Sequence, residues 1–185
     1  MSNPPLALDA ALAPLRHRVD YAATEPLFAS SAEPDLTILG PEVVLRRDPE
    51  ARIGGHWSSP QGRLLELHTE VQAPGAWLGL HIALPRSLPP LDQLTWIAVV
   101  ARSNAARAIA IRVCLRSGLP TGGFQDSFFA HHLLSQGRLS DHHDVLAPAQ
   151  LPDLPRTAPW RELVLFLPPA EGIDWALHDL RIFAL

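Results

Sequence analysis

Short segments in which apolar and polar residues alternate recur along the chain beyond Pro34. A period of two places successive side chains on opposite faces of a β-strand, so such a segment predicts a strand with one buried face. The more continuously apolar segment 95–102 predicts a central strand covered on both sides. The predicted strands cover residues 36–39, 43–46, 63–71, 76–84, 95–102, 109–116, 124–129, 160–167 and 175–183. Between Ala130 and Pro159 the sequence predicts a long polar connection rich in proline.

Turn residues separate the first four predicted strands. Gly40-Pro41 lies between the first two, and Ala73-Pro74-Gly75 between 63–71 and 76–84, where the hairpin signal is clearest. Eight or more strands at this spacing, without alternating helices, favour two packed antiparallel sheets. The predicted fold is therefore all-β: a two-sheet antiparallel β-sandwich of jelly-roll-like form.

The first 34 residues are less regular than the rest. Residues 6–15 fit either one short amphipathic helix or an extended arm lying on the domain. We therefore expect an N-terminal arm or short helix at 1–34 and the β-sandwich domain at 35–185. No positive charge precedes the first apolar stretch, and Asp9 interrupts it, so we expect no signal peptide and a cytoplasmic protein.

Composition narrows the classes of partner. Because 47% of the residues are hydrophobic and 18% charged, in short runs, neither a disordered chain nor a membrane protein fits. The formal net charge is −4, and all 15 basic residues are arginines scattered among acidic ones, so we expect no nucleic-acid partner. The single cysteine, Cys114, lies in an apolar run and is expected to be a buried, inert thiol.

The predicted hairpin also predicts a binding surface. Outside the core, its strands and strand 109–116 would present aromatic, carboxylate, imidazole and guanidinium groups on one sheet face. A flat ring beside such groups suits a sugar, which has apolar C–H faces and hydroxyls of fixed direction. The candidate ligand-binding residues are Trp77, His81, Glu66, His68, Arg112 and Arg116. The alternative is an ordinary solvated sheet face with Trp77 under a loop.

A family resemblance covers about residues 60–185. The segments WLGLHIALP, TWIAVVARSNAARAIAIRVCLRS, FQDSFF, RELVLFLP and WALHDLRIF follow the order seen in a known sandwich. The chain resembles the galactose-binding-like β-sandwich shared by many carbohydrate-binding modules. This resemblance implies a non-catalytic, lectin-like module that binds a glycan or glycan-like group without a cofactor, as an accessory to a carbohydrate-handling enzyme.

The segment HHLLSQGRLSDHHD, residues 131–144, offers a different function. Its imidazoles and carboxylates are of the types that bind transition metals, and adjacent histidines on a strand point to opposite faces. One histidine from each pair and one carboxylate would form a triad, so the alternative metal ligands are His131, His142 and Asp144. That triad would suit a metal-dependent enzyme on a double-stranded β-helix, whereas a solvated, metal-free loop is the preferred interpretation.

Enzyme motifs of other kinds are absent from the sequence. There is no G-x-S-x-G elbow, P-loop or Rossmann fingerprint. We therefore favour a binding protein over an enzyme. A scaffold protein whose exposed sheet face docks another protein chain is a further alternative.

Overall fold

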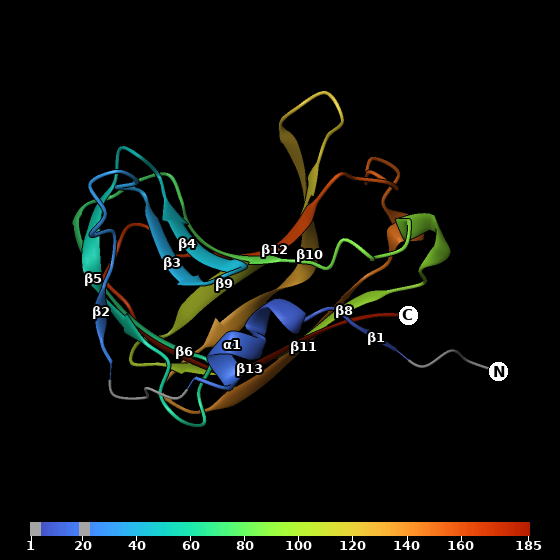
Figure 1. The fold of residues 1–185 in the computed structure, drawn as a ribbon. Coiled ribbons are helices and arrows are strands. Elements are labelled where there is room, and N and C mark those ends of the chain that lie inside the picture. The colour runs from blue at the N-terminus through green and yellow to red at the C-terminus, as the bar shows by residue number, and fades with distance from the viewer. Residues whose placement is uncertain (1–4, 19–22) are drawn as a thin grey trace.

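The protein is a sandwich of two antiparallel sheets in this computed structural model, which describes residues 5–18 and 23–185 (Figure 1). The seven-stranded sheet has the order β11-β8-β13-β6-β5-β2, with β1 also paired to β13. Its strands are β1 (Leu6–Ala7), β2 (Glu25–Pro26), β5 (Arg52–Ser58), β6 (Leu65–Ala73), β8 (Ile97–Ala105), β11 (Ser140–Leu146) and β13 (Asp174–Ala184). The predicted all-β sandwich is confirmed.

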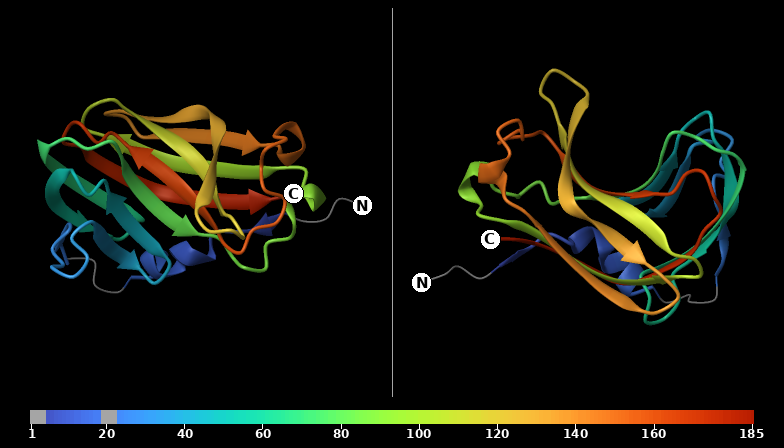
Figure 2. Two further views of the ribbon diagram at one scale, coloured as in Figure 1. Left: turned by 90° about the horizontal axis from the view of Figure 1, so that it is seen from above. Right: turned by 180° about the vertical axis from the view of Figure 1, so that it is seen from behind.

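The six-stranded sheet has the order β10-β9-β12-β7-β4-β3. Its strands are β3 (Leu36–Gly40), β4 (Val43–Arg47), β7 (Leu78–Ala83), β9 (Ile109–Gly118), β10 (Phe124–Ser135) and β12 (Arg161–Leu167). This sheet bends, so that β3 and β4 on one side and the β9–β10 turn on the other rise above β12 (Figures 1 and 2). Its outer face is therefore concave.

The core lies between the two sheets and follows the predicted alternation. In β9 the residues Ile111, Val113 and Leu115 are buried against the opposite sheet. A polar contact also joins the sheets: the Trp175 indole Nε1 of β13 donates to the Ser135 Oγ of β10 over 3.1 Å. The longer strands of both sheets thus contribute their apolar faces to one core.

The N-terminal segment packs on the edge of this core. Residues 6–7 are extended in β1, and η1 (Ala10–Leu12) and α1 (Ala13–Arg16) follow as two short helical turns. Leu8, Leu12 and Leu15 are buried, and the Leu8 amide donates to the carbonyl of Ile182 over 2.8 Å. The segment therefore covers apolar surface that the two sheets leave open.

Two further short helical turns, η2 (Leu91–Gln93) and η3 (Pro148–Gln150), lie in connections between strands. Within the described residues, no helix has both the length and the apolar character needed to cross a membrane.

The predicted hairpin of 63–71 and 76–84 is wrong. β6 pairs with β5 and β13 in the seven-stranded sheet, whereas β7 pairs with β4 and β12 in the six-stranded sheet. Asp48 fixes this crossover, because its Oδ2 accepts from the Ala76 amide over 2.6 Å and its own amide donates to the Trp77 carbonyl over 3.0 Å. Residues 74–77 therefore carry the chain from one sheet to the other.

The predicted connection at 130–159 is also wrong in its first half. β10 continues to Ser135 after a bulge between Phe128 and His132, and β11 follows at Ser140–Leu146. The histidine-rich segment thus lies mostly on strands and not on a solvated loop. Only residues 147–160 form the expected irregular connection.

Candidate functional site

The six predicted ligand-binding residues do not share one surface. Because β6 and β7 belong to different sheets, their outer faces lie on opposite sides of the sandwich. Glu66 and His68 lie on the outer face of the seven-stranded sheet. The outer face of the six-stranded sheet carries His81, Arg112 and Arg116. Trp77 precedes β7 by one residue and is half-buried.

The concave outer face of the six-stranded sheet gathers aromatic and charged side chains from several strands. Alternation along each strand and the register between strands place them on this side. We call this surface the arginine–aromatic face; its residues are Arg46, Arg112, Arg116, Phe124, Asp126, Phe128, Trp160, Glu162 and Phe166.

Arg116 lies at the centre of a fixed cluster on this face. Its Nε and Nη2 donate to the two carboxylate oxygens of Asp126 over 2.7 and 2.8 Å, a bidentate pairing. Its guanidinium also lies 3.8 Å from the ring centroid of Phe124. Burial disfavours the charge, but the hydrogen bonds and charge of Asp126 outweigh it and raise the Arg116 pKa. The guanidinium is therefore both charged and held in place.

Arg112 forms a second stacked pair on the same strand. Its guanidinium lies 3.7 Å from the ring centroid of Phe128. The Phe128 ring in turn packs on Phe166 with a centroid separation of 5.9 Å. Cys114 is the neighbour of Phe128 across the strands and is fully buried, and burial raises the pKa of its thiol. The expected inert thiol is thus confirmed as a buried group.

Trp160 provides an exposed ring at one end of this face. A Cβ atom added to Gly118 would overlap the indole at Nε1 and Cε2, so the ring lies directly against the glycine backbone of β9. The Trp160 side chain is 39% exposed. It borders a depression of about 260 Å³ that Arg86 and Glu162 also line. An accessible indole therefore stands beside charged groups.

His81 also projects from this face of the sheet, but it is buried among its neighbours. Its side chain is only 4% exposed, and its Nδ1 lies 2.8 Å from the Glu162 Oε2. Its Nε2 is buried and forms no hydrogen bond within the described part of the chain. Gly79 leaves room for the ring, since an added Cβ would lie 2.9 Å from that Nε2. His81 therefore orients Glu162 more than it offers a surface to a ligand.

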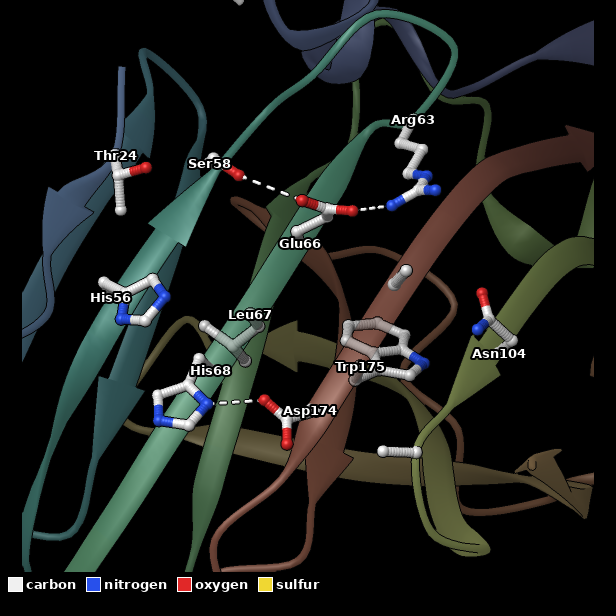
Figure 3. A pocket seen from close by; sticks show the side chains of 12 residues that line it. Thr24, His56, Ser58, Arg63, Glu66, Leu67, His68, Asn104, Asp174 and Trp175 are labelled. Atoms are coloured by element: carbon white, nitrogen blue, oxygen red, sulfur yellow. Dashed lines mark hydrogen bonds and ion pairs between the residues drawn. The ribbon is translucent and has the colours of Figure 1, made fainter. Parts of the chain in front are cut away.

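The outer face of the seven-stranded sheet has a depression of about 420 Å³ (Figure 3). On its floor the His68 Nδ1 lies 2.5 Å from the Asp174 Oδ1, and the His56 ring stacks on His68 with a centroid separation of 4.7 Å. Glu66 accepts from the Ser58 hydroxyl over 3.3 Å and pairs with Arg63. The side chains of this depression are thus largely bonded to one another, and none of its aromatic rings is a broad exposed platform.

Replacing Asp174 with Asn is expected to lower the pKa of His68. The hydrogen bond to Asp174 is the main cause that raises this pKa, with burial opposing it and Glu70 adding to it. Because the folded-state pKa is raised, protonated His68 stabilises the fold below about pH 6.5, and the effect is lost as the pH rises through the folded pKa. An NMR titration of the His68 ring measures the shift, with Asp141→Asn as control. An unchanged His68 pKa in Asp174→Asn would contradict the pairing.

The alternative metal ligands are near one another but do not form a metal site. The His131 amide donates to the Asp144 Oδ2 over 2.7 Å, and the His131 Nδ1 lies 3.2 Å from Oδ1. His142 points inward, and burial lowers its pKa. In the described ranges, no group of three histidine, cysteine, aspartate or glutamate side chains is arranged to hold a metal ion. Asp144 instead ties β10 to β11 at the bulge.

Solved structures of other proteins have a fold similar to that of this chain. No protein-family model matches the sequence, and no curated protein matches it either. Among solved structures, the chain is similar to a cyclase from Fischerella sp. TAU, with a TM-score of 0.53, 14% identity and 98% of both chains covered. It is similar to the family 11 carbohydrate-binding module from Clostridium thermocellum in complex with a β-1,3-1,4-mixed-linked tetrasaccharide, with a TM-score of 0.51, 9% identity, 79% of this chain and 89% of that one covered.

The chain is also similar to the family 11 carbohydrate-binding module of a cellulosomal cellulase of Clostridium thermocellum. The TM-score is 0.51 and the identity 8%, with 80% of this chain and 90% of that one covered. The predicted resemblance to the carbohydrate-binding-module sandwich is therefore confirmed as a resemblance of fold. Identities this low carry nothing about the ligand.

Sequence reasoning identified Arg112 and Arg116 but not their aromatic partners. Phe124, Phe128 and Phe166 come from the two strands that flank β9, and their pairing depends on the register. The alternation in 124–129 indicated that Phe124 and Phe128 point outward, because both are out of phase with the buried Phe129. Trp160 lies just before β12, and nothing in the local sequence indicates its contact with Gly118.

Proposed function

We propose that this chain is a non-catalytic carbohydrate-binding module that binds an oligosaccharide on the arginine–aromatic face. The observation that carries the proposal is the Trp160 ring, which lies against Gly118 and remains exposed on a concave sheet face. An exposed, immobilised ring is a stacking surface for the C–H face of a pyranose, and it loses little conformational entropy on binding.

Polar groups of fixed direction support the same function. Asp126 and Glu162 are each held by a basic partner, Arg116 and His81, so their remaining acceptor sites point in set directions. Such preorganised groups match the hydroxyls of a sugar. Phe124, 51% exposed, extends the apolar surface beside Trp160. The face thus combines stacking and directional hydrogen bonding.

The pairing of these carboxylates favours binding over catalysis. A general acid or base needs a carboxyl group free to exchange a proton with the substrate. Asp126 is held in a bidentate pair with Arg116, so both of its carboxylate oxygens already accept hydrogen bonds. The fold likeness to a module solved with a mixed-linked tetrasaccharide supports a binding role. The proposal includes that this chain acts as an accessory to a carbohydrate-handling enzyme.

A glycan array followed by calorimetry on the best ligand tests this function. Trp160→Ala is expected to weaken binding at least about tenfold, because the stacking surface is lost. The control is Trp96→Ala, since Trp96 is 36% exposed, comes just before β8 of the other sheet and hydrogen-bonds through its backbone to Leu185. Full affinity in Trp160→Ala would contradict the proposed site. An array without any bound glycan would contradict the proposed function and favour a docking surface for another protein.

A further inference from the structure

The charges of the arginine–aromatic face do not cancel. Its two carboxylates are already engaged, Asp126 by Arg116 and Glu162 by His81. Arg46 and Arg112 are both exposed, and within residues 5–18 and 23–185 neither forms an ion pair. The face therefore presents two guanidinium groups that no carboxylate of the described residues neutralises, although the overall charge of the chain is negative.

Arg112 is prepared to bind and not merely exposed. Stacking on Phe128 fixes its guanidinium 3.7 Å from the ring centroid and leaves its N–H edges free of carboxylates. A planar guanidinium of this kind matches a carboxylate or sulfate with two parallel hydrogen bonds. Because the side chain of Arg112 is already held in place, it loses little conformational entropy when it binds an anion.

Arg46 and Arg112 lie in one row across the sheet. The register pairs Arg112 with Phe166, Phe166 with Gly79, and Gly79 with Arg46. Three interstrand spacings separate the two arginines, about 14 Å along the sheet. Between them lie Phe166 and Gly79, with the buried His81 ring over Gly79. A single sugar unit does not span this distance, whereas an oligosaccharide with acidic groups on separate units does.

We propose that the ligand of the arginine–aromatic face is an acidic oligosaccharide whose carboxylate or sulfate groups bind Arg112 and Arg46. This inference rests on the proposed function and adds the chemical class of the ligand. Neutral hydroxyls would satisfy neither guanidinium charge, and burying an unpaired charge beneath a bound sugar is unfavourable. An anion on the ligand removes that cost and adds a charge-assisted hydrogen bond.

Calorimetry with matched ligand pairs tests the inference. The first pair is an oligogalacturonide and its carboxyl-reduced form, and the second is a heparin-derived oligosaccharide and its desulfated form, which separate carboxylate from sulfate. At least one acidic member is expected to bind about tenfold or more tightly than its neutral counterpart, with an advantage that falls as salt rises. Arg112→Gln and Arg46→Gln should each remove most of that advantage, whereas Arg112→Lys retains part of it.

The control variant is Arg102→Gln, because Arg102 is an exposed arginine on the outer face of the other sheet. It should keep the full preference for the acidic ligand. Equal affinity for acidic and neutral members overturns the inference and leaves the proposed function intact. A preference that survives in the Arg46/Arg112 double variant, or equal binding of a single-stranded DNA oligonucleotide, also overturns it. Failure of every glycan on the array overturns the proposed function itself.

Discussion

Trp175→Ala is expected to lower the free energy of unfolding by about 3 to 5 kcal/mol. The indole of Trp175 is 2% exposed and lies in the core between the sheets. Its Nε1 donates to Ser135, which also bonds to Ser103, so truncation leaves a cavity and an incomplete buried polar group. Thermal unfolding should show a fall in melting temperature of at least about 6 °C.

Trp160→Ala is the matched comparison for the loss of stability expected in Trp175→Ala. The same atoms are removed, but Trp160 is on the surface and its loss opens no core cavity. We expect a change below about 1 kcal/mol. If the two variants were equally destabilised, Trp160 would be a packing residue and its assignment as a stacking platform would be wrong.

Gly55→Ala is expected to destabilise the fold by at least about 3 kcal/mol. Gly55 has φ 126°, a conformation that L-residues rarely adopt. A Cβ at this position would also overlap the carbonyl oxygen of His68 in the neighbouring strand β6. Both effects act on the pairing of β5 with β6, and urea denaturation measures their sum.

The adjacent residue supplies the control for Gly55. Gly54 has no heavy atom within 4 Å of a built Cβ and no positive φ. Gly54→Ala should therefore change stability by no more than about 0.5 kcal/mol. Equal effects of the two substitutions would mean that β5 tolerates a side chain at Gly55 and that its pairing differs from the one described.

The strands were predictable because each has one face in a common core. In β9 the alternation of Ile111, Val113 and Leu115 with Arg112 and Cys114 indicated both the strand and its inward face. The Gly40-Pro41 turn likewise indicated the β3–β4 hairpin, which the structure confirms. Burial of alternate side chains is a local property, so a local pattern reveals it.

The partner of each strand was not predictable from the same pattern. Leu67 in β6 and Leu80 in β7 both point into the core, but from opposite sheets. Alternation specifies the buried face of a strand and not the sheet to which it belongs. The hydrogen bonds of Asp48 to 76–77 decide the crossover, and these are contacts between distant residues. The candidate surface derived from a hairpin therefore mixed residues of two faces.

The bulge in β10 concealed another part of the structure. Between Phe128 and His132 the register shifts, which interrupts the period of two. The sequence pattern therefore did not indicate that His131 and His132 belong to a strand. The arginine–aromatic face was hidden for a related reason. Its cation–aromatic contacts cross between β9 and β10, and the contact of Trp160 with Gly118 depends on how β12 enters the sheet.

An NMR titration of the assigned protein with the best ligand from the array tests directly whether an oligosaccharide binds the arginine–aromatic face. The largest shift changes are expected at the Trp160 indole N–H and at amides of β9, β10 and β12 around Arg112 and Arg116. Shift changes centred on β5, β6 and β13, around His68, would place the ligand in the opposite depression and contradict the account.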